Sequence, residues 1–200
     1  MELLVTLGRT FGFSLAAGVN LYATVAILGL ATRYEWVALP EQYRIFDNSW
    51  VIYTALALFV VEFVADKVPW LDTIWDGIHT AIRPLGGALV AVSTLGEASP
   101  AVQGMVALLG GGLAASSHTT KATARVTANA SPEPFSNWAL SLGEDVFVIS
   151  LALLALQYPL LALGVVALAV LVSVVVLMLL ARAIRRRLFG PRPPAPAMGG

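Results

Sequence analysis

The longest stretch without a charge is the feature that most constrains the fold of this chain. Residues 146–181 contain no Asp, Glu, Lys or Arg and consist mostly of Leu, Val and Ala. A helix needs about 20 consecutive apolar residues to cross a bilayer, so this stretch is long enough for the end of one membrane span and the whole of another. Pro159 marks the turn between the two, because a proline interrupts a helix. The stretch therefore predicts an integral membrane protein.

Composition agrees with that prediction. The 200 residues are 58% hydrophobic and 12% charged, whereas a soluble domain usually carries about 25% charged residues. We predict an all-α membrane bundle that forms a single transmembrane domain over residues 1–190, followed by a disordered, Pro-rich cytoplasmic tail over residues 191–200. The absence of cysteine excludes disulfides, thiolate metal sites and iron–sulfur clusters.

Six membrane spans are expected from the apolar stretches. Their approximate limits are residues 10–31, 50–65, 69–95, 101–126, 136–158 and the remainder of the uncharged stretch. Five of the twelve basic residues lie beyond the last acidic residue, Asp145, which marks the C-terminal end as cytoplasmic rather than as a nucleic-acid surface. An even number of spans makes both termini cytoplasmic. We predict a multi-pass protein of the bacterial cytoplasmic membrane. Its partner is the lipid bilayer and not nucleic acid, and the sequence is compatible with a homo-oligomer.

The third apolar stretch carries a polar stripe. Asp72, Asp76, His79 and Arg83 follow one another at intervals of four, three and four residues, which places them on one face of a helix. Pro84 and two glycines then predict a kink or a break. Residues 69–95 are accordingly interfacial, re-entrant or fully spanning. A solvated face of an interfacial helix would explain the stripe without any functional site.

A cationic face continues the fourth apolar stretch. His118, Lys121, Arg125 and Asn129 fall on one side of a helix whose other positions are Ser, Thr, Ala and Val. A charge at the centre of a bilayer costs about 3 kcal/mol, so these side chains are expected to meet carboxylates, line water or lie near an interface. The alternative without a functional site is that these side chains extend to the membrane–water interface, which suits Arg125 better than the more deeply placed His118.

Four carboxylates are the candidates to meet those cations. Glu62 and Asp66 lie one helical turn apart, and Glu144 and Asp145 lie within a predicted span. We expect them to act as counter-charges or as proton carriers, because a buried carboxyl group tends to hold its proton.

An internal repeat is indicated by two segments that align without a gap. Residues 12–24 read GFSLAAGVNLYAT and residues 110–122 read GGGLAASSHTTKA, which places Asn20 opposite His118. The match predicts two inverted halves of three helices each, residues 1–100 and 101–190, with interrupted or re-entrant helices at their interface. A chance match in an Ala- and Leu-rich chain is the alternative.

Two long segments resemble a known family. VEFVADKVPWLDTIWDGIHTAIRP at residues 61–84 and SSHTTKATARVTANASPEPFSNWALSLGED at residues 116–145 are similar to those of small polytopic bacterial membrane proteins catalogued as a domain of unknown function. The resemblance covers most of the chain. It implies an integral membrane protein but supplies no substrate, reaction or catalytic residue.

Transport is the function that the sequence favours. We expect a small secondary transporter, channel or flippase for an anionic solute or an anionic lipid headgroup, without a cofactor. The anion would be bound by the following residues: Asn20, His118, Lys121, Arg125 and Asn129.

Two alternatives belong to other classes. One is a membrane enzyme acting on a phosphorylated lipid, with Mg²⁺ or Mn²⁺ on Asp66, Asp72, Asp76 and His79, although no specific metal or catalytic motif is present. The other is a structural or assembly factor whose charge pairs specify helix packing.

Overall fold

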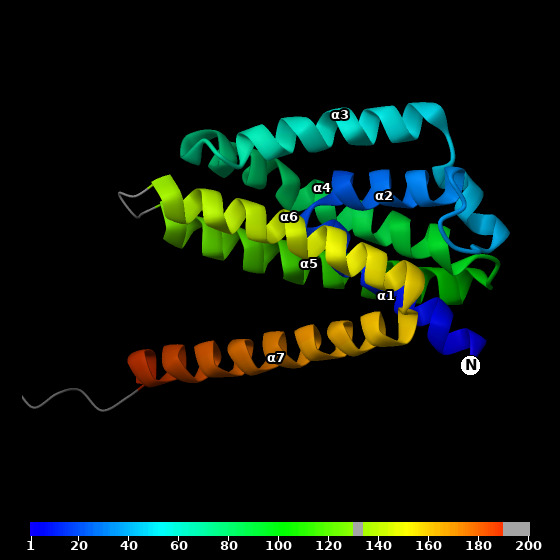
Figure 1. Cartoon of the computed structure of the whole chain (residues 1–200). Coiled ribbons are helices and arrows are strands. Elements are labelled where there is room, and N and C mark those ends of the chain that lie inside the picture. Colours follow the sequence, from blue (N-terminus) through cyan, green and yellow to red (C-terminus); the bar gives the residue numbers. More distant parts are fainter. Residues whose placement is uncertain (130–133, 190–200) are drawn as a thin grey trace, which may run out of the picture. The chain divides into compact units, whose positions relative to one another are not determined.

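The computed structural model describes residues 1–129 and 134–189, and most of these residues are helical. These residues form seven α-helices and one 3₁₀ helix and no strand, which confirms the all-α prediction (Figure 1). The elements are α1 Glu2–Val19, α2 Leu21–Arg33, η1 Glu41–Phe46, α3 Ser49–Ala65, α4 Pro69–Leu95, α5 Pro100–Asn129, α6 Pro134–Gln157 and α7 Pro159–Phe189. The chain divides into two compact units, Met1–Val166 and Ala167–Gly200, and the first contains α1 to α6.

The first apolar stretch is broken at Asn20. This residue has extended backbone angles, φ −147° and ψ 100°, and its side-chain oxygen accepts a hydrogen bond from the Ala23 main-chain nitrogen at 2.9 Å. Asn20 therefore ends α1 and caps α2, the position at which asparagine is most favourable in a helix. The single helix predicted over residues 10–31 is wrong.

The two resulting helices form a hairpin. The Thr94 hydroxyl donates to the Thr10 hydroxyl (3.2 Å) halfway along α1, and the Thr94 carbonyl accepts from the Gln42 amide (3.5 Å) beyond the end of α2. The bend between the two helices packs tightly against α5. A Cβ atom added to Gly18 would lie only 2.2 Å from the Ala114 carbonyl oxygen, so only a glycine fits at this position. Thus α1 enters the bundle and α2 returns to the end at which α4 finishes (Figure 1).

α4 continues through Pro84. Of the two predicted outcomes at this proline, the break is wrong, since the helix runs over 27 residues, and the kink stays a prediction. Close packing against α5 accompanies the proline: a Cβ atom on Gly87 would lie 2.3 Å from the Ala114 Cβ, and one on Gly110 would lie 2.4 Å from the Ala91 Cβ. Glycines at these positions let the two helices approach one another as closely as small residues allow in membrane bundles.

Two helices are long and apolar enough to cross a membrane. They are Pro69–Leu95 and Asn137–Gln157, and three shorter apolar helices, Leu21–Arg33, Ser49–Ala65 and Pro159–Val175, accompany them in the described part of the chain.

The residues aligned by the repeat differ in local structure. The chain is broken at Asn20, whereas α5 is continuous through His118. The inverted repeat stays a prediction.

Candidate functional site

Eight charged side chains from α3 to α6 meet inside the bundle, and we refer to them as the charge cluster. They are Glu62, Asp66, Asp72, Asp76, Arg83, Lys121, Arg125 and Glu144. Glu144 is the most exposed member, with 11% of its side chain accessible. The polar stripe of α4 and the cationic face of α5 are thus buried, so neither a solvated face nor interface snorkelling describes them.

Arg125 binds the ends of three helices together. Its Nη1 atom donates to the Asp66 carbonyl (2.8 Å) and to Asn137 Oδ1 (3.0 Å), and its Nη2 atom donates to Asp66 Oδ2 (3.0 Å). Its Nε and Nη2 atoms both donate to the Glu144 carboxylate. The planar guanidinium fork suits such a bidentate arrangement, which joins α5 to the end of α3 and to α6.

Lys121 lies among three carboxylates. Its Nζ atom is 3.0 Å from Asp66 Oδ2, 3.2 Å from Glu62 Oε1 and 3.6 Å from Glu144 Oε2. Lys121 lies one helical turn before Arg125 on α5, so the two cations share Asp66 and Glu144.

Arg83 connects the cluster to His118. Its Nη2 atom donates to Glu62 Oε1 at 2.6 Å, and its Nη1 atom lies 3.3 Å from Asp76 Oδ1 and 2.7 Å from His118 Nδ1. A guanidinium only donates, so His118 Nδ1 accepts and the ring proton is on Nε2, which faces the Thr80 hydroxyl at 3.2 Å. His118 is therefore a neutral acceptor for Arg83.

His79 faces the hairpin instead of the charge cluster. Its Nε2 atom is 2.9 Å from the Tyr22 hydroxyl, its Nδ1 atom is 2.7 Å from the Trp75 carbonyl, and its ring stacks on Trp75. Because a carbonyl only accepts, Nδ1 carries the proton and Nε2 accepts from Tyr22. Tyr22 has no signal in the sequence, since its contact with His79 depends on the turn at Asn20.

Asn20 and Asp145 meet at the bend of the hairpin. Asn20 Nδ2 donates to Asp145 Oδ1 at 3.4 Å, and Asp145 is 7% exposed. Asn20 is not among the hydrogen-bond partners of His118 in the described part of the chain. The side chain of Asn129 lies outside the described residues.

Carboxylates outnumber cations in this region. Within the described residues, the charge cluster contains five carboxylates and three cations, and beside it Asp145 adds a sixth carboxylate and Lys67 a fourth cation. The buried oxygens that accept no hydrogen bond from these residues include Glu62 Oε2, Asp66 Oδ1, Asp145 Oδ2 and both carboxylate oxygens of Asp76. An uncompensated buried charge is costly, so the excess must be neutralised by protons or by a bound cation.

The alternative metal site is not assembled. No group of three His, Asp or Glu side chains in the described residues lies in a position to hold a metal ion. Asp66 is bound by Lys121 and Arg125, and His79 by Tyr22.

A family model covers most of the chain. The model described as a domain of unknown function (DUF4126) matches residues 7–179. No curated protein and no solved structure gives a match. The chain belongs to the family of this domain of unknown function, DUF4126.

Proposed function

We propose that this protein is a small secondary transporter of the bacterial cytoplasmic membrane that moves an anion together with protons. The observation that carries the proposal is the composition of the charge cluster, in which every cation is bound by carboxylates and the carboxylates are in excess. Intramembrane ionisable residues that face one another in a bundle are typical of substrate and proton pathways.

The outer surfaces of the helices support the membrane placement. Large apolar side chains are exposed along α3 and α4, among them Val60 at 58%, Val64 at 55%, Leu85 at 67% and Leu89 at 70%. Apolar side chains exposed along neighbouring helices are typical of a surface that faces lipid or a protein partner. Since the hairpin of α1 and α2 returns to the side from which it entered, we propose five spans, α3 to α7, in place of six.

The hairpin also supports a transport role. Non-helical backbone at membrane depth is tolerated where it lies against protein or lines a cavity, and interrupted helices surround the binding sites of many secondary transporters. In this chain the interruption at Asn20 faces Asp145, the neighbour of Glu144 in the charge cluster.

The mechanism that we propose is a competition between ion pairs. In the described conformation Glu62, Asp66 and Glu144 bind Lys121 and Arg125. Protons that neutralise these carboxylates weaken the ion pairs, and an anion then takes the place of the carboxylates on the two cations. Release of the anion on the other side restores the ion pairs and frees the protons.

The test uses purified protein in proteoliposomes. Radiolabelled inorganic phosphate serves as a free anion, and fluorescent phosphatidylglycerol, followed by dithionite quenching, serves as an anionic lipid headgroup. An inward proton gradient should accelerate the movement of one of these probes. Lys121→Gln should abolish the acceleration, whereas Arg33→Gln should not, because Arg33 pairs with Asp47 outside the cluster. Movement of neither probe, or movement indifferent to the gradient, contradicts the proposal.

A structural role is the second candidate. Arg125 joins α5 to the end of α3 and to α6 through buried hydrogen bonds, an arrangement that fixes helix packing. If Lys121→Gln lowers the thermal stability of the protein and no probe moves in any variant, the cluster is a packing device.

A further inference from the structure

Asp145 differs from the carboxylates of the charge cluster because it has no ion pair. Its Oδ1 atom accepts a hydrogen bond from Asn20 Nδ2 at 3.4 Å, and its Oδ2 atom has no hydrogen-bond partner among the described residues. Each carboxylate of the cluster lies within 3.9 Å of a lysine or arginine nitrogen, whereas no such pair forms at Asp145 in the part of the chain that the structure describes. The side chain is also buried, with 7% of the residue exposed.

The charges around Asp145 do not compensate a negative charge on it. Four charged side chains act on it electrostatically: Asp66, Lys121, Lys67 and Glu62. Two of these are negative and two are positive, so they provide no net positive charge. The hairpin of α1 and α2 contributes the neutral amide of Asn20. Because an ionised carboxylate is far more costly to bury without compensation than a neutral carboxyl group, such a residue holds a proton.

A polar route leads to Asp145 from one side of the protein. Ser141 is fully buried and lies one helical turn before Asp145 on α6. Its hydroxyl accepts a hydrogen bond from Lys67 Nζ at 3.4 Å, and Lys67 is half-buried directly beyond the end of α3. Lys67 and Ser141 therefore connect Asp145 with the side on which α3 ends and α6 begins.

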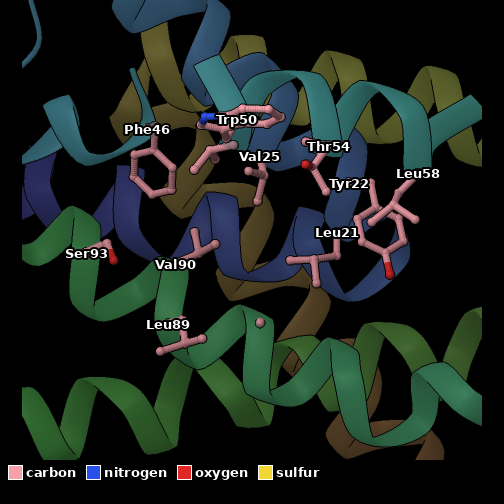
Figure 2. A pocket seen from close by; sticks show the side chains of 13 residues that line it. Leu21, Tyr22, Val25, Phe46, Trp50, Thr54, Leu58, Leu89, Val90 and Ser93 are labelled. Atoms are coloured by element: carbon pink, nitrogen blue, oxygen red, sulfur yellow. The ribbon is translucent and has the colours of Figure 1, made fainter. Parts of the chain in front are cut away.

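The surfaces in the other directions are apolar. Further along α6 the buried residues are Val148, Ala152 and Ala155, none of which is exposed. Directly after Asn20, residues of α2 line a groove between α2, α3 and α4 whose lining is almost entirely carbon (Figure 2). Neither surface offers the hydrogen-bonding groups that a proton needs. Asp145 is thus connected with one side only, as alternating access requires of a coupling site in a secondary transporter.

We propose that protons enter this protein from the cytoplasm at Asp145, past Lys67 and Ser141, and that Asp145 is protonated in the described conformation. In the five-span arrangement proposed above, in which the arginine-rich C-terminal end is cytoplasmic, α3 ends and α6 begins on the cytoplasmic side. The proposal rests on the proposed function and adds the residue at which the coupled proton binds.

The next step is transfer of the proton to the charge cluster. The donor is Asp145 Oδ2, and the acceptor is Asp66 Oδ1, which has no hydrogen-bond partner among the described residues. Transfer leaves Asp145 ionised and Asp66 neutral. A neutral Asp66 no longer forms ion pairs with Lys121 and Arg125, so the two cations become available to the anion.

The protonation state is tested by infrared spectroscopy of the full chain in nanodiscs at neutral pH, with aspartate isotopically labelled at its side-chain carboxyl carbon. A protonated carboxyl group absorbs apart from a carboxylate, and the label separates aspartate bands from glutamate bands. Asp145→Asn should remove one labelled carboxyl band. Asp145→Glu keeps the carboxyl group and should move that band to the unlabelled position. Asp47→Asn, which removes an exposed partner of Arg33, is the control and should keep every band. Labelled bands unchanged in both Asp145 variants would mean that Asp145 is ionised and would overturn the proposal.

The route is tested by the rate at which the Asp145 band shifts in deuterated buffer. Ser141→Ala should slow this exchange severalfold and keep the band. The matched control is Ser150→Ala, at an exposed position of the same helix, and it should exchange like the parent protein. Exchange in Ser141→Ala as fast as in the parent would show that protons reach Asp145 by another path.

The coupling is tested with the two probes in proteoliposomes. Asp145→Asn should abolish the acceleration of probe movement by the proton gradient; acceleration that persists would contradict entry at Asp145. If neither probe moves in the parent protein while the Asp145 band is present, the transport mechanism is wrong and the proton site stands. The infrared measurement thus separates a failure at Asp145 from a failure of the proposed function.

Discussion

At the scale of single residues, the excess of carboxylates means that the loss of a cation from the charge cluster should destabilise the protein more than the loss of a carboxylate. Arg83 lies within ion-pair distance of Glu62 and Asp76, so its replacement leaves Glu62 with Lys121 alone and takes from Asp76 the cation that it faces. Arg83→Gln should lower the free energy of unfolding by about 3–5 kcal/mol. Asp76→Asn should cost much less or stabilise the protein, because it removes part of the excess negative charge. Denaturant unfolding in detergent at neutral pH measures both. Equal losses for the two variants would mean that the carboxylates are not in excess in the folded protein.

Tyr43 gives a pH dependence that lies outside the proposed spans. Burial raises the pKa of its phenol well above the ordinary value of 10.0, with Arg9 acting weakly in the other direction. The folded state therefore favours the neutral phenol, and this contribution to stability is complete below pH 10 and is lost as the pH rises through the raised pKa. Thermal melting between pH 9 and pH 11 should show a smaller loss of stability in Tyr43→Phe than in the parent protein. Identical pH profiles would show that Tyr43 is accessible to solvent.

At the scale of elements, the hairpin depends on the cap at Asn20. Asn20→Ala removes the hydrogen bond to the Ala23 nitrogen and the contact with Asp145. The loss of a helix cap costs about 0.5–2 kcal/mol, and Asn20→Ser should recover the capping part. Denaturant unfolding of the two variants measures the difference. If Asn20→Ser is as unstable as Asn20→Ala, the cap contributes nothing and the contact with Asp145 accounts for the whole effect.

Asn20 and Pro84 show how far local patterns predict this fold. The apolar stretch around Asn20 has the composition of a continuous span, and it turns back where the Asn20 cap and close packing against α4 and α5 coincide. Pro84 carries a strong local signal for a break, yet α4 continues, with a glycine of α5 facing the proline carbonyl. Helical content follows from apolar periodicity alone. The turns depend on tertiary contacts that the periodicity does not contain.

The candidate site was predictable in part for the same reason. The cost of burying a charge predicts that Lys121 and Arg125 meet carboxylates, and Glu62, Asp66 and Glu144 lie against them. Which carboxylate meets which cation depends on the crossing of four helices. The sequence therefore predicts which residues form the site, but not which carboxylate pairs with which cation.

At the scale of the whole molecule, the hairpin decides the topology of the membrane protein that we propose. With α1 and α2 returning to one side, the N-terminus and the loop of residues 34–48 lie on the same side, whereas a span over residues 10–31 would separate them. The chain has no cysteine, so single cysteines can be introduced without a background signal. Leu3→Cys and Glu41→Cys should react with a membrane-impermeant maleimide added from the same side of oriented vesicles. Trp70→Cys, at the start of α4 and 67% exposed, is the control and should react from the other side. Reaction of Leu3→Cys together with Trp70→Cys would restore the continuous first span and leave the break at Asn20 as a kink within it.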